Sequence, residues 1–251
     1  MQYSRDINCE CSHYKDLQSL NFEDRLKAKQ YWSNGYIYDN NESWECECHK
    51  KYRLTERFNR LANKKSFSNY EEFKDYTYLG DVDNFAKLEK LPQLISSHNL
   101  KDVLMFIDGP VGCQKTTSVL RFMYELFIKD FTVDYYNFGN LINDFSQKNI
   151  DESELLDLDW LIIDDCFEST PVNFKAPYLQ FYNLILKRRK PTIIISTFDK
   201  KTLLERKDSN SYNFDMLEKM FLKIEKYNTV LHFNDCPAKL QLGKNIDIWS
   251  L

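Results

Sequence analysis

The segment VLMFIDGPVGCQKTT (residues 103–117) decides the fold, because an apolar run, a loop with two glycines and a Lys-Thr-Thr sequence follow one another directly. A short, continuous apolar run is typical of a strand that is covered on both faces. Beyond the loop, apolar residues recur at helical spacing at Val119, Phe122, Met123 and Leu126. The segment therefore predicts a strand, a tight loop and an amphipathic helix.

The loop matches the phosphate-binding pattern G-x-x-x-x-G-K-[ST] at all but one position. Lys115 is expected to reach the β- and γ-phosphate oxygens, and the Thr116 hydroxyl is expected to bind Mg²⁺. The backbone N–H groups of such a loop turn toward the β-phosphate. The predicted ligand is ATP or ADP with Mg²⁺, and the predicted binding residues are Gly109, Pro110, Val111, Gly112, Cys113, Gln114, Lys115, Thr116 and Thr117.

Gln114 is the departure, because it stands where the pattern has glycine. A side chain is tolerated at this position only if the backbone angles are accessible to an L-residue. The expected consequence is weaker nucleotide affinity.

Four further strands are predicted after the first, at residues 133–138, 159–164, 192–197 and 229–233. They alternate with helical patterns, one of which spans Ala176 to Lys187. Strands that alternate with helices indicate a parallel sheet with crossover connections. The predicted fold class is therefore α/β, with a P-loop core built on a five-stranded parallel sheet.

Polar residues follow two of these strands. Asp164 and Asp165 end an apolar strand, and Ser196-Thr197 ends another. Ligands of open α/β sheets bind at this edge. Asp164 is expected to hold Mg²⁺ through water, and Asp165 to orient or deprotonate the attacking water. Ser196-Thr197 can present a hydroxyl to the γ-phosphate or to that water. Asp165 is shorter than the glutamate that usually serves this role, so slow hydrolysis is expected.

The basic run Lys187-Arg188-Arg189-Lys190 has two interpretations. It either complements the negative end of a helix dipole or forms a phosphate-binding patch.

Composition restricts the class of protein. Hydrophobic residues make up 43% and charged residues 29%, which indicates a folded chain rather than a disordered one. No apolar run approaches the roughly 18 residues of a membrane span, and the N-terminus is polar, so no membrane association and a cytoplasmic location are expected. A net charge of −4 argues against a surface that coats nucleic acid. A shift in composition near residue 80 predicts two parts, 1–80 and 81–251.

Seven cysteines in a reducing compartment raise the question of metal binding. Cys9 and Cys11 form one close pair, and Cys46 and Cys48 form another, with His13 and His49 as alternative ligands. Two such pairs would supply the four ligands of a structural zinc site, and buried free thiols are the alternative. The isolated cysteines are interpreted as packing residues; they are Cys113, Cys166 and Cys236.

With these motifs in this order, the chain resembles the DnaC/DnaI/IstB group of AAA+ ATPases. The similar stretches are WECECHKK (44–51), residues 159–165 and KPTIIIST (190–197). The resemblance implies an N-terminal zinc-binding module that contacts a replicative helicase, and it makes Thr197 the sensor 1 residue. It also places the trans-acting arginine finger near Lys223, with Arg206 as the alternative. Lysine lacks the bidentate fork of arginine.

The resemblance implies an ATP-dependent helicase loader of a bacterial or phage-infected cell. Its expected partners are a hexameric replicative helicase, single-stranded DNA and further copies of itself in a ring or spiral. Two alternatives stay open: a transposition ATPase of the IstB type, and a helicase-binding adaptor or inhibitor that does not hydrolyse ATP. The residues at Gln114, Asp165, Thr197 and Lys223 favour a weak ATPase or the adaptor.

Overall fold

The fold is described from a computed structural model, which describes residues 30–33, 36–39, 42–70, 82–167, 175–205 and 211–234. The chain divides into two compact units, Met1–Tyr70 and Glu71–Leu251. The boundary predicted at residue 80 lies in the segment 71–81, outside the described residues. Each unit is described by itself.

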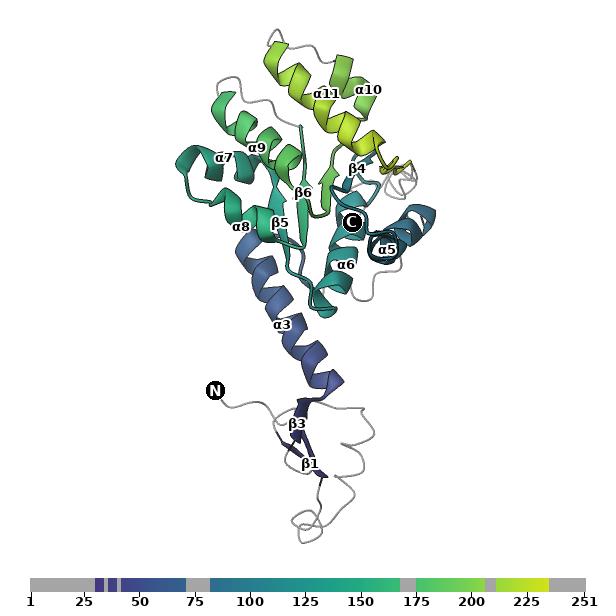
Figure 1. Cartoon of the computed structure of the whole chain (residues 1–251), viewed down its shortest axis with the longest axis vertical. Helices are drawn as coiled ribbons and strands as arrows, with labels where there is room; N and C mark the ends of the chain where they lie inside the picture. Colours follow the sequence, from purple (N-terminus) through teal and green to yellow (C-terminus); the bar gives the residue numbers. More distant parts are fainter. Residues whose placement is uncertain are drawn as a thin grey trace, which may run out of the picture. The chain divides into compact units, whose positions relative to one another are not determined.

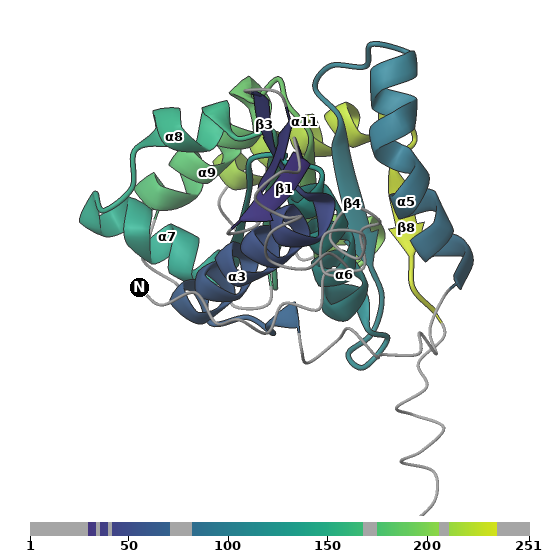
Figure 2. The same cartoon turned by 90° about the horizontal axis from the view of Figure 1, so that it is seen from below.

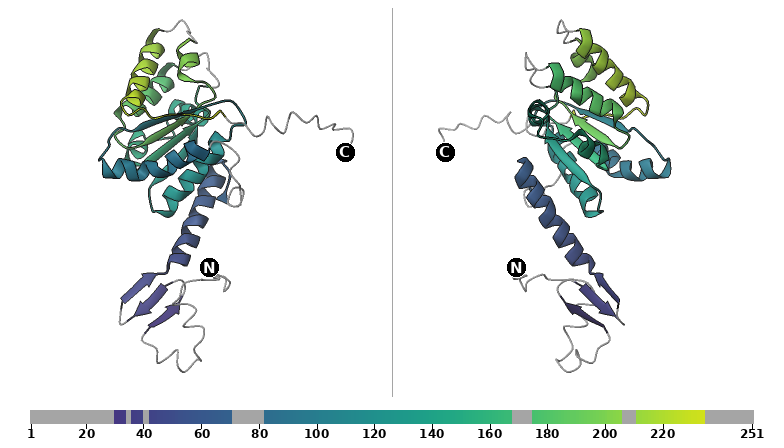
Figure 3. Two further views of the ribbon diagram at one scale, coloured as in Figure 1. Left: turned by 90° about the vertical axis from the view of Figure 1, so that its right-hand side faces the viewer. Right: turned by 60° about the vertical axis from the view of Figure 1, so that its left-hand side comes forward.

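The first unit contains a three-stranded antiparallel sheet followed directly by a helix (Figure 3). The strands are β1 (Gln30–Ser33), β2 (Tyr36–Asp39) and β3 (Glu42–Glu45), and the helix is α3 (Glu47–Lys65). Cys46 caps α3, because its sulfur accepts the N–H of His49 at 3.4 Å. Leu54, Phe58 and Ala62 form the buried stripe of α3.

The second unit is built on a parallel sheet with the strand order β5-β6-β7-β4-β8 (Figure 1). Its strands are β4 (Leu104–Asp108), β5 (Val133–Asn137), β6 (Trp160–Asp164), β7 (Thr192–Ile195) and β8 (Val230–His232). Each of the five predicted strands is present, and the predicted five-stranded parallel sheet is confirmed.

Helices cover both faces of this sheet. On one face α6 (Lys115–Ile128) packs with α5 (Val82–Ser97), as Figure 2 shows, and Phe122 meets Trp160 at 5.4 Å between ring centroids. The other face is covered by α7 (Phe138–Gln147), α9 (Lys175–Lys187) and α11 (Ser211–Glu225), with the short helices α8 (Glu152–Asp157) and α10 (Lys200–Glu205) beside them. A hydrophobic core cluster of buried residues lies on this second face and includes Phe106, Leu161, Phe181 and Phe221.

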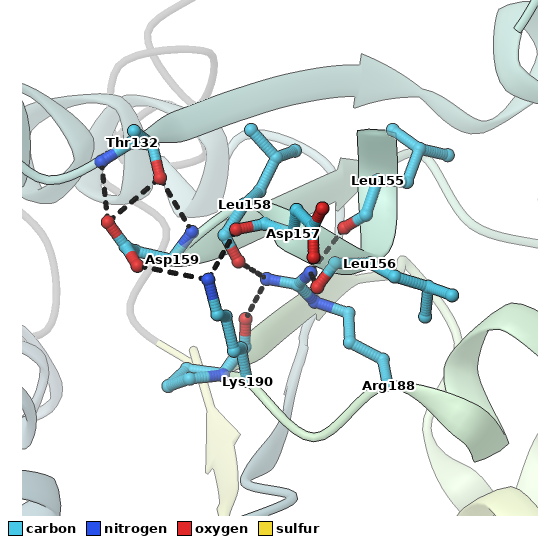
Figure 4. Close-up of polar contacts among 9 residues, drawn as sticks. Thr132, Leu155, Leu156, Asp157, Leu158, Asp159, Arg188 and Lys190 are labelled. Carbon is cyan, nitrogen blue, oxygen red and sulfur yellow. Dashed lines mark hydrogen bonds and ion pairs between the residues drawn. The ribbon is translucent and has the colours of Figure 1, made fainter. Parts of the chain in front are cut away.

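The basic run after α9 is structural. Lys187 pairs with Glu152, Arg189 pairs with Asp102, and Lys190 contacts Asp159. Arg188 is fully buried, and its guanidinium donates to the carbonyls of Leu155, Leu156, Leu158 and Pro191 (Figure 4). It also donates to the Thr192 hydroxyl. These contacts fasten the last turn of α8 to the start of β7. Arg188 therefore serves packing within its own chain, and the other three cations of the run form ion pairs with carboxylates of the same chain.

Among the described residues, no helix is both long and apolar enough to cross a membrane.

Candidate functional site

The glycine-containing loop connects the end of β4 at Asp108 to the start of α6 at Lys115. Gly109 begins the loop with φ +144°, and a Cβ added there would lie 2.1 Å from the backbone oxygen of Phe233. The N–H of Phe233 also donates to the Asp108 carbonyl at 2.8 Å. The first residue of the loop is therefore pressed against the backbone that follows β8, where only glycine fits.

Gln114 is the residue that caps α6, and it has left-handed backbone angles, φ 61° and ψ 25°. The glycine of the motif would adopt this conformation freely, whereas an L-residue does so at a cost of about 1 kcal/mol. The Gln114 carbonyl accepts hydrogen bonds from the N–H and the hydroxyl of Ser118. The loop thus keeps its helix-starting geometry with glutamine in place of glycine.

Lys115 is 7% exposed and its amine folds back over the loop. It donates to the carbonyl oxygens of Gly109 at 2.6 Å and Pro110 at 2.9 Å. These bonds hold a positive charge against the first two residues of the loop. A phosphate that reached the loop would offer this amine charged acceptors in exchange for neutral ones.

Cys113 differs from its interpretation as an isolated packing residue. It is fully buried, and its sulfur takes part in a disulfide bond. Cys166, by contrast, is a buried member of the hydrophobic core cluster that contains Phe106 and Phe181, as predicted. Cys236 lies outside the described residues.

Thr116 and Asp164 are brought together from elements far apart in the sequence. The Thr116 hydroxyl donates to Asp164 Oδ2 at 2.7 Å, and the hydroxyl of Tyr135 donates to the same oxygen at 2.8 Å. The other oxygen, Oδ1, accepts the N–H of Asp165 at 2.8 Å. Asp164 is 1% exposed. Burial, followed by the charge of Asp164, raises the pKa of Tyr135, so its hydroxyl remains a proton donor.

The carboxylate of Asp165 is held by the neighbouring strand β5. Asn137, the last residue of β5, donates from Nδ2 to Asp165 Oδ2 at 2.7 Å. The Oδ1 atom of Asn137 accepts the N–H of Gly139 and caps α7, which fixes the orientation of the amide. Asp165 has a positive φ of 55°. The predicted water-orienting carboxylate is therefore exposed and bonded to Asn137.

Ser196 and Thr197 follow β7, which lies between β4 and β6 in the sheet. Thr197 is half-buried in this loop, while the hydroxyl of Ser196 accepts the N–H of Phe198. The strand order therefore brings the predicted sensor residue to the position between the loop and the acidic strand end.

Asp108 and His232 form a pair at the base of the loop that the sequence did not indicate. Asp108 is 2% exposed, and its Oδ1 lies 2.6 Å from Nδ1 of His232. Among the described residues, its other oxygen has no hydrogen-bond partner. Burial raises the pKa of Asp108, while His232 and Lys115 oppose this rise.

The residues present fit Mg²⁺ with a nucleoside triphosphate. A hydroxyl and a carboxylate oxygen 2.7 Å apart are the hard donors that Mg²⁺ takes in proteins. The loop that precedes them has a close backbone approach at Gly109 and ends at the N-terminus of a 14-residue helix, where the dipole favours anions.

Lys223 lies in α11, and its amine caps the end of α9. It donates to the carbonyls of Ile185 at 2.8 Å and Arg188 at 2.7 Å. Burial lowers the pKa of Lys223 to about 8. Its role toward a neighbouring subunit stays a prediction, and the alternative residue, Arg206, lies outside the described residues.

The predicted zinc ligands are only partly within the described residues. Cys46 and Cys48 lie at the start of α3, and His49 Nδ1 contacts Glu45 at 2.8 Å. Cys9, Cys11 and His13 lie outside the described part of the chain. Within the described part, no group of three or more His, Cys, Asp or Glu side chains is placed to hold a metal ion. The zinc site stays a prediction.

The strand order and the loop together define an α/β protein with a P-loop core. Comparison with solved structures found partial similarities: to DnaI (14% identity, TM-score 0.47, 64% of this chain and 85% of that chain), to a primosome component of Streptococcus pyogenes serotype M3 (12%, 0.46, 65% and 84%) and to the DnaC helicase loader (18%, 0.39, 63% and 94%). Neither a family model nor a curated protein matches the chain.

Proposed function

We propose that the second unit binds ATP with Mg²⁺ in the loop from Gly109 to Thr117 and that this binding is a conformational switch. The observation that carries the proposal is the hydrogen bond of 2.7 Å between Thr116 and Asp164, which joins the loop to the acidic strand end. Lys115 in the same loop supplies the positive charge for the phosphates.

Nucleotide binding would rearrange two sets of bonds. The amine of Lys115 would leave the carbonyls of Gly109 and Pro110 for phosphate oxygens, and the Thr116 hydroxyl would leave Asp164 for Mg²⁺. Both changes occur at the start of α6 and at the end of β6. This is the physical basis for a switch between two states of the loop.

Calorimetric titration of the full chain with ATP, with and without Mg²⁺, tests nucleotide binding. Lys115→Ala should weaken binding at least roughly 10-fold, because it removes a charge-assisted contact to the phosphates. The matched control is Lys129→Ala, an exposed lysine that follows the other end of α6. Equal affinities for the two variants contradict the assignment of the loop.

We further propose that the nucleotide switch serves a helicase loader. The support is the sequence resemblance at residues 44–51, 159–165 and 190–197, together with the nucleotide site. In this proposal the first unit contacts a hexameric replicative helicase, copies of the second unit assemble into a ring or spiral, and loop lysines hold single-stranded DNA. DNA binding of this kind should weaken steeply as the salt concentration rises.

Co-purification with candidate replicative helicases, with and without ATP, followed by measurement of the mass of the complex, tests the partner. Recovery of a helicase with a defined stoichiometry supports the loader. Recovery of a transposase without a helicase favours the transposition ATPase instead.

A second candidate function is a helicase-binding adaptor that binds ATP without turnover. The bond between Asn137 and Asp165 favours it, because the carboxylate expected to orient water is short and engaged elsewhere. Phosphate release measured with helicase and single-stranded DNA present distinguishes the two candidates. Release no faster than that of Lys115→Ala leaves the adaptor.

A further inference from the structure

Tyr135 occupies a position at the nucleotide site that no sequence motif indicates. It is the third residue of β5, next to β6 in the sheet, and it is 6% exposed. Its hydroxyl donates to Asp164 Oδ2 at 2.8 Å, on the oxygen that also accepts the Thr116 hydroxyl. One carboxylate oxygen therefore receives donors from two different elements.

The two donors differ in what nucleotide binding would do to them. Thr116 lies on the loop side, and in the proposed function its hydroxyl turns to Mg²⁺. Tyr135 comes from the buried strand β5 and not from the phosphate loop, so its bond to Asp164 would remain. After the rearrangement, Oδ2 keeps the bond from Tyr135 and Oδ1 keeps the bond from the Asp165 N–H.

The carboxylate of Asp164 can also accept a further hydrogen bond. An ionised carboxylate offers about four lone-pair directions, and the two oxygens of Asp164 accept three hydrogen bonds from the described residues. Departure of the Thr116 hydroxyl frees a direction on Oδ2 that faces the loop. A water bound to Mg²⁺ would be able to donate to that direction, provided that the carboxylate does not rotate.

We infer that Tyr135 is a positioning residue that fixes the carboxylate of Asp164 for the magnesium-bound nucleotide, an inference that rests on the proposed function. Tyr135 touches neither the nucleotide nor the metal in this scheme. It acts through Asp164, as the groups that orient a metal ligand commonly do.

The test measures the Mg²⁺ concentration that half-saturates the gain in ATP affinity, by calorimetric titration of the full chain. Tyr135→Phe removes one oxygen and keeps the ring. It should raise that concentration roughly 10-fold, the lower end of the usual effect of removing a group that orients a metal ligand. Affinity for ATP in excess chelator should stay at the wild-type value, which a general loss of folding would not permit.

The matched control is Tyr136→Phe, the next residue of the same strand. Tyr136 is also buried, at 8% exposed, but it lies on the opposite face of β5. There it belongs to the hydrophobic core cluster that contains Phe106 and Phe181, and its hydroxyl lies near Asp134. This variant should leave the Mg²⁺ dependence unchanged. If both phenylalanine variants shift it equally, or if neither does, the inference is wrong.

A double variant identifies the route of the effect. If Tyr135 acts through Asp164, then Tyr135→Phe combined with Asp164→Asn should show the same Mg²⁺ dependence as Asp164→Asn alone. Additive losses overturn the inference. If wild-type protein binds ATP with no dependence on Mg²⁺, the proposed metal site fails as well, whereas a normal wild-type response with an unaffected Tyr135→Phe variant refutes only the role of Tyr135.

Discussion

Replacement of Arg188 by alanine is expected to destabilise the second unit by about 3 kcal/mol. The guanidinium is fully buried and donates to the carbonyls of Leu155, Leu156 and Leu158, which end the short helix α8 (Figure 4). The last carbonyls of a helix have no partner within it. Each buried carbonyl left without a donor costs about 1 kcal/mol or more, so three of them give the expected loss.

The charge of Arg188 is retained in this arrangement. Burial lowers its pKa to about 10, and the charges of Asp159 and Asp157 oppose that shift. Arg188→Lys should recover part of the stability, because an ammonium has three donors on a flexible stem and cannot reproduce the planar fork. The expected order of stability is wild type, then lysine, then alanine.

Urea unfolding followed by circular dichroism gives the free energy of unfolding of each variant. Hydrogen exchange of peptides that contain residues 160–164 and 192–195 reports on the sheet itself. Arg189→Ala is the matched control, because its side chain is 76% exposed, although its partner Asp102 is mostly buried. Such a pair contributes about 1 kcal/mol at most. Equal losses for Arg188→Ala and Arg189→Ala would refute the reasoning.

Two further predictions concern the base of the phosphate loop. Gly109→Ala should destabilise the fold by more than about 2 kcal/mol and abolish ATP binding, since its Cβ would lie 2.1 Å from the Phe233 oxygen at φ +144°. The control is Gly139→Ala, whose Cβ would lie 3.3 Å from the nearest atom, Oδ1 of Asn137. A similar thermal midpoint for both variants would contradict the prediction. Burial raises the pKa of Asp108, so its folded-state contribution is present at low pH and lost as pH rises, whereas a hydrogen bond lowers the pKa of Asp199 and reverses the sign. Relative to wild type, the free energy of unfolding of Asp108→Asn should therefore be higher at pH 7 than at pH 4.5, and that of Asp199→Asn should be lower at pH 7 than at pH 4.5. Urea midpoints that follow the same trend for both variants would contradict these pKa shifts.

The sequence determined the fold class because its signals are local. Continuous apolar runs at residues 103–108, 159–164 and 192–197 identify strands buried on both faces, and the glycine-containing loop identifies the first of them as the strand that leads into the phosphate loop. The stripe at Val119, Phe122, Met123 and Leu126 is buried as expected. Each of these features follows from period and residue type within one segment.

The candidate site was predictable only where motif residues supply it. Lys115, Thr116 and Asp164 have recognisable neighbours in the sequence, and the structure brings the last two within 2.7 Å. Tyr135 and Asn137 were missed, although hydroxyl and amide side chains in a strand of the core were a signal. Their partners lie 29 and 28 residues away, and no local pattern identifies such a pairing.

Tertiary structure alone decided the burial and the hydrogen-bond partners of the charged side chains. Within one basic run, Arg188 is buried and bonded to backbone carbonyls, whereas Arg189 is exposed. Lys223 caps the end of α9. Asp108 was paired with His232 by the adjacency of β4 and β8. Local periodicity determines which segments form strands and helices, whereas desolvation and hydrogen-bond partners depend on which segments the fold places side by side.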